Sequence, residues 1–248
     1  NYRYIHGDIA KITQSDKTHH ALLSGISIGD RREHSAFKRA NVSRQEGEES
    51  IDFLVQNDLL IRDKSQAQPI NEREEVSDKF FISLLFLRFW FSSISPYYKG
   101  IRDGDYSEVK KRLENMKQDF SDLVYDQLVK ELLVKSFRED PIEKVGSYWD
   151  KNNEIDILAK TKSGKIVAGI CKYSKSKAKK SELTKLKEQC AKAELEPEIF
   201  VVFSKSGFSN ELKKEKSESL KLYTLKNLKS LIDDLSEEDL LVNTNKKY

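Results

Sequence analysis

The sequence predicts a mixed α+β or α/β protein built from two domains. In the first third, short amphipathic segments precede two strand-like runs. After Pro96 the order becomes helix, three strands, helix and strand. The chain has 248 residues, which is long enough for two modest domains, each with a core of its own.

The first domain is expected to be helical and to close with a hairpin. Asp30 with Glu33, and Ser43 with Glu46, have the spacing of capping boxes at two helix starts. A short "ANV" turn separates these helices, as in helix-turn-helix units. "LLIRDKS" and "DKFFIS" are typical of strands, and the polar loop 65–77 lies between them in the position of a wing. These elements predict a winged helix-turn-helix.

The apolar run "FFISLLFLRFWFSSI" (80–94) ends this domain. It is too short to cross a bilayer, and it contains Arg88. We therefore predict a buried linking helix and no membrane partner, with a first domain over residues 1–95.

A DNA-binding surface can be predicted for this domain. A recognition helix would present Arg44 and Gln45 to the major groove. Four further basic residues could contact phosphates: Lys38, Arg39, Arg62 and Lys64. The same helix and the wing also carry carboxylates, which repel a duplex: Glu46, Glu48, Glu49, Asp52, Glu72, Glu74 and Glu75. Two interpretations stay open, a DNA-binding module and a protein-docking module.

The second domain, residues 96–248, is expected to begin with one long amphipathic helix, either continuous or broken. "VGSYWDK", "NEIDILAK" and "IVAGICKYS" predict three strands, and the "TKSGK" turn predicts a hairpin between the last two. A lysine-rich helix (about 177–194) and the strand "PEIFVVFSKSG" follow. This order is the α-β-β-β-α-β core of restriction-endonuclease-like folds, which have a mixed sheet.

Such a fold suggests metal-dependent phosphodiester hydrolysis. Mg²⁺ requires converging carboxylates, and a nearby lysine can orient the attacking water. Asp156 lies on one predicted strand and Lys172 on the next, and alternation puts position 170 on the same face as Lys172. Asp126, on the preceding helix, could supply a further acid.

Four motifs resemble a known family: "FFISLLFLRFWFSSISP", "VYDQLVKELL", "VGSYWDKNNEIDILA" and "GICKYS". They are similar to the C-terminal domain of unknown function (number 234) of archaeal-type DEXX-box ATPases. The resemblance implies a PD-(D/E)XK nuclease-like domain preceded by a winged helix, and an ATPase as a partner. Carried over, the catalytic and metal positions fall on Asp126, Asp156 and Lys172.

Two departures from that family affect the expected chemistry. Ile170 replaces the glutamate expected before Cys-Lys, and an isoleucine has no oxygen to ligate a hard cation. Asp126 is one methylene shorter than the usual glutamate. A displaced carboxylate could rescue the site, with Glu154, Glu182 and Glu188 as candidates. Asp156 and Lys172 could instead form a structural ion pair.

The ATPase half of such proteins has no counterpart in the sequence, because no G-x-x-x-x-G-K-[ST] motif occurs. The chain is therefore expected to be either a fragment or a free-standing relative of the C-terminal half. Its two cysteines are too few for a disulfide scaffold, which predicts a cytoplasmic location.

The clearest basic feature begins just after Lys172. Seven lysines lie between Lys175 and Lys192, and the first four, Lys175, Lys177, Lys179 and Lys180, are candidate DNA contacts. The alternative is an ordinary solvated helix face. The whole-chain charge of +3 does not decide between them.

Two functions are therefore carried forward. The first is a DNA-binding or scaffold protein with an inactive nuclease-like domain and no cofactor. The second is an active Mg²⁺-dependent endonuclease with a displaced carboxylate.

Overall fold

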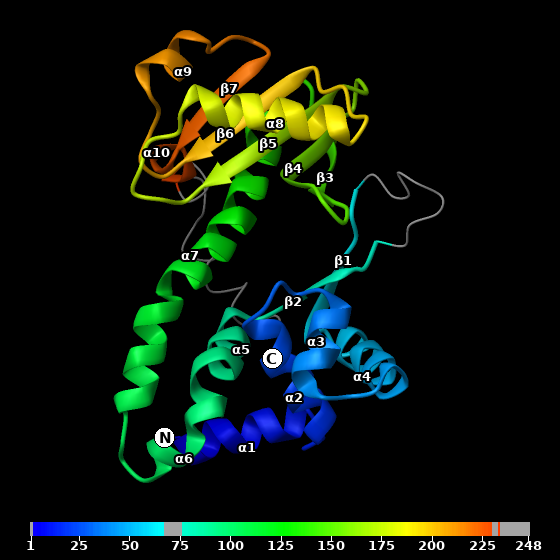
Figure 1. Cartoon of the computed structure of the whole chain (residues 1–248), viewed down its shortest axis with the longest axis vertical. Helices are drawn as coiled ribbons and strands as arrows, with labels where there is room; N and C mark the ends of the chain where they lie inside the picture. The colour runs from blue at the N-terminus through cyan, green and yellow to red at the C-terminus, as the bar shows by residue number, and fades with distance from the viewer. Residues whose placement is uncertain (1, 67–75, 230–232, 234–248) are drawn as a thin grey trace. The chain divides into compact units, whose positions relative to one another are not determined.

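A computed structural model describes residues 2–66, 76–229 and 233, and the side chains from residue 7 onward (Figure 1). The chain divides into two compact units. Unit 1 comprises residues 1–64 and 77–117, and unit 2 comprises residues 65–76 and 118–248. The division lies after Lys117, within a helix, whereas the sequence suggested a boundary after residue 95.

The described part of unit 1 begins with four helices, which are followed by a two-stranded antiparallel sheet. The helices are α1 (Tyr2–Ile12), α2 (Lys17–Ser27), α3 (Glu33–Ala40) and α4 (Arg44–Gln56). The strands are β1 (Leu60–Asp63) and β2 (Lys79–Ile82). Most of the predicted wing, residues 67–75 with Glu72, Glu74 and Glu75, lies outside the described residues.

The helix starts of unit 1 confirm one predicted capping box and correct the other. Ser43 and Glu46 cap α4 reciprocally, as their spacing indicated. Asp30 does not cap α3, because that helix begins at Glu33 after Arg32. Arg32 is held in an extended conformation by an antiparallel bridge to Lys79 of β2. The Asp30 carboxylate instead accepts the Arg32 N–H at 3.2 Å and the Ser35 hydroxyl at 2.8 Å.

The core of unit 1 combines apolar residues from its helices with those of the sheet. Its fully buried members include Leu22, Leu23, Ile51, Leu54 and Phe80. The burial of Ile51 and Leu54 follows the helical spacing of apolar residues along α4, as the sequence predicted.

The apolar run 80–94 is not one buried helix. Its first residues belong to β2, and the rest form α5 (Leu85–Phe89) and a π-helical turn (Trp90–Ile94). Leu85 and Phe86 are about half exposed, whereas Trp90 and Phe91 are buried in the core. A 3₁₀ turn (Ser95–Tyr97) and α6 (Tyr98–Arg102) lead to the long helix α7 (Ser107–Ser136), which is continuous and belongs to both units.

Unit 2 is built on a five-stranded mixed sheet in the order β3-β4-β5-β6-β7. The strands are β3 (Ile142–Trp149), β4 (Glu154–Thr161), β5 (Ile166–Lys172), β6 (Ile199–Ser204) and β7 (Leu220–Thr224). β3, β4 and β5 are antiparallel neighbours, whereas β5, β6 and β7 run parallel. The three further helices are α8 (Lys180–Lys192), α9 (Asn210–Lys214) and α10 (Leu225–Leu228). The predicted order of elements is therefore confirmed.

Helices cover both faces of this sheet (Figure 1). On one face, Tyr125, Val129 and Leu133 of α7 pack against a cluster that contains Ile157 and Phe203. On the other face, Leu183 and Leu186 of α8 and Leu212 of α9 pack against the opposite side chains of the strands. Successive residues of β5 therefore contact different helices.

The outer edge of β3 is covered by the segment that follows β1. The Gln66 N–H donates to the Ser147 carbonyl at 3.0 Å, and the Trp149 N–H donates to the Ser65 hydroxyl at 3.0 Å. Gly146 permits this approach, because a Cβ at that position would lie 2.4 Å from Gln66 Nε2. The last described residues before the wing therefore belong to the sheet of unit 2.

Candidate nucleic-acid interface

Two of the three predicted catalytic residues, Asp126 and Asp156, lie where β4 and β5 separate. The backbone pairing of the two strands ends at Ile157 and Gly169, so the Cys171 N–H lies beyond the ladder. The Asp156 carboxylate accepts this N–H at 2.8 Å. Asp156 therefore takes the place that a backbone carbonyl would have in a continued ladder.

Two residues of α7 join Asp156 beside Cys171. Lys130 Nζ donates to Ser147 Oγ at 2.8 Å, and this hydroxyl donates to the Asp156 carbonyl at 2.8 Å. Asp126 lies close enough to the Cys171 thiol to influence its ionisation. Burial raises the pKa of that thiol well above its ordinary value, and the carboxylates of Asp156 and Asp126 raise it further. The structure thus brings the two predicted acids together around a protonated thiol.

Tyr125 completes the α7 side of this cluster. Its ring centroid lies 4.9 Å from that of Tyr173, and its hydroxyl is buried without a hydrogen-bond partner. Burial is also the main reason that its pKa is raised. Sequence reasoning did not identify Lys130, Ser147 or Cys171, although Cys171 stands between the two positions that it examined.

Position 170 lies on the opposite face of β5. Ile170 packs against the two apolar clusters that contain Leu183 and Leu186 of α8. Its side chain fills space between the sheet and the helices and supplies no oxygen, as the sequence indicated.

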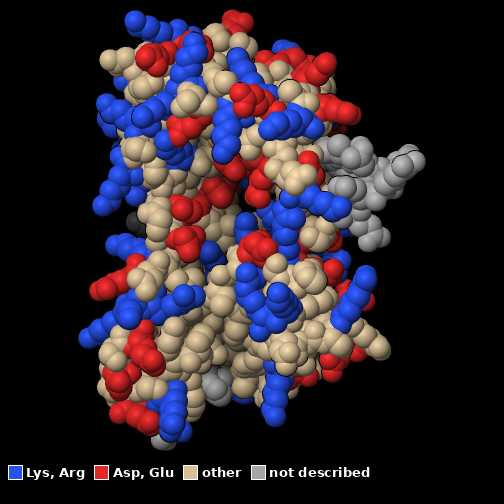
Figure 2. Space-filling model, in the orientation of Figure 1, with Lys and Arg blue, Asp and Glu red and all other residues tan. Residues whose placement is uncertain are grey.

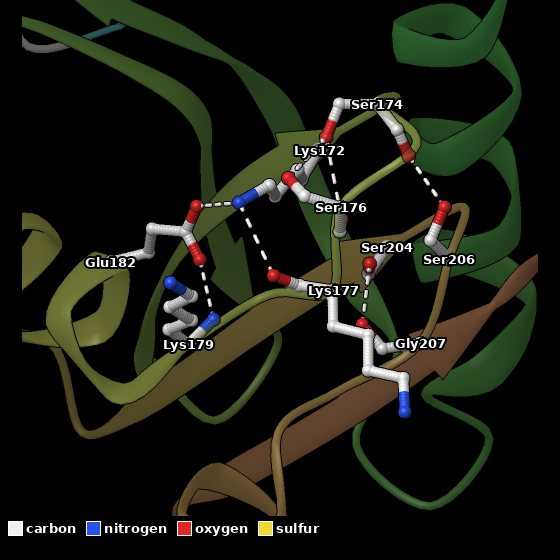
Figure 3. Close-up of polar contacts among 9 residues, drawn as sticks. All are labelled: Lys172, Ser174, Ser176, Lys177, Lys179, Glu182, Ser204, Ser206 and Gly207. Carbon is white, nitrogen blue, oxygen red and sulfur yellow. Dashed lines mark hydrogen bonds and ion pairs between the residues drawn. The ribbon is translucent and has the colours of Figure 1, made fainter.

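Lys172 lies at the end of the same face and forms an ion pair with Glu182 of α8 (Figure 3). Its Nζ also donates to the Lys177 carbonyl at 3.3 Å. The other oxygen of Glu182 accepts the Lys179 N–H at 2.5 Å, at the start of α8. The ion pair that was considered between Asp156 and Lys172 is therefore replaced by two other contacts. Lys172 pairs with Glu182, and the Asp156 carboxylate accepts the Cys171 N–H.

The carboxylates that were candidates for Mg²⁺ do not assemble into one ligand set. Glu154 is exposed at the start of β4, and both oxygens of Glu182 are engaged. Across residues 2–66, 76–229 and 233, no three His, Cys, Asp or Glu side chains are grouped so that they could hold a metal ion. The donor set present at this position therefore does not fit a hard divalent cation.

The basic residues that follow Lys172 are at the surface. Lys175, Lys177, Lys179 and Lys180 are all exposed, and Figure 2 shows Lys and Arg side chains gathered over this end of unit 2, at the left of the view. Lys180 forms an ion pair with Glu215. Among the described residues, no carboxylate forms an ion pair with the other three lysines.

The basic candidates of unit 1 are also exposed, but several are paired within the unit. Arg44 Nε lies 2.7 Å from Glu48, and Gln45 donates to Glu49 at 3.1 Å. Arg62 lies 3.1 Å from Asp52 and 3.3 Å from Asp78, and Arg39 lies 3.5 Å from Asp30. Lys38 and Lys64 are exposed. These contacts place carboxylates beside the residues that were expected to face DNA.

One comparison with known proteins gives a match. Residues 90–184 match the family model DUF234, described as archaeal and bacterial proteins of unknown function. The match covers α7, β3, β4, β5 and the start of α8, and so contains Asp126, Asp156 and Lys172. No curated protein and no solved structure matches the chain.

The structure also bears on the question of a membrane. In the part of the chain that it describes, every helix is too short or too polar to serve as a transmembrane span.

Proposed function

We propose that this chain is a DNA-binding protein in which a nuclease-like domain has lost its metal chemistry. The observation that carries the proposal is the environment of two residues of β5. Ile170 occupies the ligand position with apolar surface, and Glu182 neutralises Lys172, while the lysines that follow stay exposed. A surface that attracts phosphates therefore adjoins a site without a metal-ligand set.

The order and pairing of elements support the two fold names behind this proposal. In unit 1, an isolated bridge between Arg32 and Lys79 joins the segment between α2 and α3 to the β1–β2 hairpin. This arrangement is typical of winged helices. In unit 2, α7, the three antiparallel strands, α8 and the parallel β6 follow the restriction-endonuclease-like order.

An ATPase or another protein is the second proposed partner, and this part rests on the family resemblance. Unit 1 has a suitable surface for it, because Glu46, Glu48 and Glu49 accompany Arg44 at the start of α4. Such a mixed surface favours a protein over a polyanion.

DNA binding can be tested by fluorescence anisotropy with labelled duplex and single-stranded DNA over a range of salt concentrations. Lys175→Gln, Lys177→Gln and Lys179→Gln would be combined in one variant. The matched control combines Lys160→Gln, Lys162→Gln and Lys165→Gln, which remove three exposed lysines at the hairpin before β5. Both variants lower the net charge equally.

We expect the first variant to bind DNA at least about tenfold more weakly and to lower the salt slope by about 2 to 3. The control should stay close to the wild type. Equal behaviour of the two variants, or no binding by the wild type at low salt, would overturn the proposal.

An active nuclease with Glu182 as the displaced acid is the second candidate, because that carboxylate is in direct contact with Lys172. It predicts cleavage of plasmid DNA with Mg²⁺ or Mn²⁺ that Lys172→Ala abolishes, and calorimetric Mn²⁺ binding that Asp156→Ala abolishes. Either result would replace the first proposal.

A further inference from the structure

Two loops of unit 2 are joined along their length. The loop after β5 and the loop after β6 leave the sheet side by side (Figure 3). The Lys205 N–H donates to the Lys172 carbonyl at 3.0 Å. Further on, the Ala178 N–H donates to the Gly207 carbonyl at 2.9 Å, and the Ser209 N–H donates to the Ala178 carbonyl at 2.8 Å. The segment 173–177 is therefore fixed at both ends.

Serine hydroxyls hold this segment and lie along it. Ser206 Oγ donates to the Ser174 carbonyl at 2.6 Å, and Ser204 Oγ, at the end of β6, donates to the Gly207 carbonyl at 2.8 Å. The hydroxyls of Ser174 and Ser176 lie 3.2 Å apart (Figure 3). The Ser174 hydroxyl also lies 3.4 Å from the Ser176 carbonyl. Both contacts are exposed, so a ligand can replace them and accept the two hydroxyl protons.

The charges around the hydroxyl pair are positive. Lys175 and Lys177 alternate with Ser174 and Ser176, and both lysines are exposed. The neighbouring carboxylates are engaged elsewhere: Glu182 with Lys172, Glu215 with Lys180, and Asp122 with Gln118 at 2.6 Å. Asp122 is also close enough to Lys205 for the two charges to interact.

We propose that the segment Ser174–Lys177 is a phosphate-binding site. The hydroxyls of Ser174 and Ser176 donate to the phosphate oxygens, and Lys175 and Lys177 neutralise the charge from either side. Ser206 is a positioning residue that fixes the Ser174 carbonyl. As a contact to a DNA backbone this inference rests on the proposed function, whereas binding of a free phosphate or a phosphomonoester does not.

A tetrahedral anion suits this arrangement because it has several acceptor oxygens to share among hydroxyls and ammonium groups. Hydrogen bonds to such an anion are roughly twice as strong as neutral ones. The backbone of the segment is already fixed by the β6–α9 loop, so binding requires little further ordering.

The test compares two serine pairs of unit 2. Ser174→Ala with Ser176→Ala removes the proposed donors. Ser217→Ala with Ser219→Ala is the matched control, because these hydroxyls also lie two residues apart, at 3.0 Å, but with Glu218 between them instead of a lysine. Anisotropy with labelled DNA and NMR titration with inorganic phosphate would be measured for both variants and for the wild type.

For DNA, we expect the Ser174 and Ser176 variant to bind about five- to tenfold more weakly, with an unchanged salt slope, because no ionic contact is removed. The Ser217 and Ser219 variant should bind like the wild type. Ser206→Ala should weaken binding by a smaller factor, and Ser206→Thr should restore it.

For phosphate, we expect the amide signals of Ser174–Lys177 to move on titration, and DNA to compete with the ion. If phosphate moves these signals and DNA does not bind, the site takes a free phosphate or a phosphomonoester, and only the proposed function fails. If DNA binds but both serine variants match the wild type and phosphate leaves these amides unmoved, the site proposal is overturned while the proposed function stands.

Discussion

The start of α4 in unit 1 and the loop before α8 in unit 2 both carry predicted DNA contacts, but the side chains there have different neighbours. Arg44 and Gln45 are followed one helical turn later by Glu48 and Glu49, which engage both side chains. Lys175 and Lys177 precede α8, where no helical neighbour lies one turn away. The position of a charge relative to a helix start therefore decides whether it is available to a ligand.

The largest expected effect on stability comes from substitution of Ile170, on the strand that precedes the loop 173–177. Ile170→Glu would place a carboxylate among the apolar residues between the sheet and α8. We expect the free energy of unfolding to fall by about 2 to 3 kcal/mol, because a carboxylate would replace apolar contacts at a partly buried position. Urea unfolding followed by circular dichroism measures this loss.

Ile170→Val is the control, with an expected loss of about 1 kcal/mol. Ile170→Glu also places a glutamate where the family that this sequence resembles has one. Mn²⁺ calorimetry on this variant therefore tests whether the acid creates a metal site. Wild-type stability together with Mn²⁺ binding would contradict the assignment of position 170 to the core.

A smaller effect is expected where Glu182 joins α8 to Lys172. Glu182→Gln would leave the partly buried Lys172 ammonium without its counter-ion and would weaken the cap on the Lys179 N–H. We expect a loss of about 1 to 2 kcal/mol in the free energy of unfolding, intermediate between exposed and buried ion pairs.

Glu188→Gln, an exposed change on the same helix, should alter stability by less than about 0.5 kcal/mol. Equal losses for the two variants would show that the pair between Lys172 and Glu182 does not stabilise the loop.

The smallest expected effect comes from removing the carboxylates at the start of α4, so that its polar side chains are as accessible as Lys175 and Lys177. Glu48→Gln with Glu49→Gln releases Arg44 and Gln45 from their charged partners. We expect DNA affinity to rise about two- to threefold at low salt, since exposed pairs of this kind are worth less than about 1 kcal/mol. Anisotropy with the same labelled DNA measures the change.

The matched control, Glu108→Gln with Glu114→Gln, removes two exposed carboxylates of α7 and should change the affinity less. An unchanged affinity after release of Arg44 would favour the protein-docking interpretation of unit 1.

The order of strands and helices could be predicted because alternation and helical spacing are local properties of the sequence. The Ser43 capping box and the turn at Gly164, whose φ is 94°, could also be predicted from a few neighbouring residues. The Asp30 capping box failed because Arg32 is held in a bridge to Lys79, forty-seven residues later. The prediction of one buried helix over residues 80–94 was wrong because the apolar residues are continuous there. Such a run fits both the end of β2 and the start of α5.

The candidate site was less predictable, for a physical reason. Alternation correctly grouped position 170 with Lys172, but which acid Lys172 meets depends on the helix that covers that face. α8 brings Glu182 to it, whereas α7 brings Asp126 to the neighbouring Cys171. The loop partners Ser174 and Ser206 are likewise set by the parallel register of β5 and β6.

The contact of Ser65 and Gln66 with the edge of β3 affects how well a shortened fragment of the chain would behave in solution. β3 is an edge strand, and unpaired edges are templates for pairing with other chains. Ser65 and Gln66, which precede β2 in the sequence, occupy part of that edge. A fragment that begins at residue 96 keeps all five strands but exposes this edge, so its propensity to aggregate should exceed that of the whole chain.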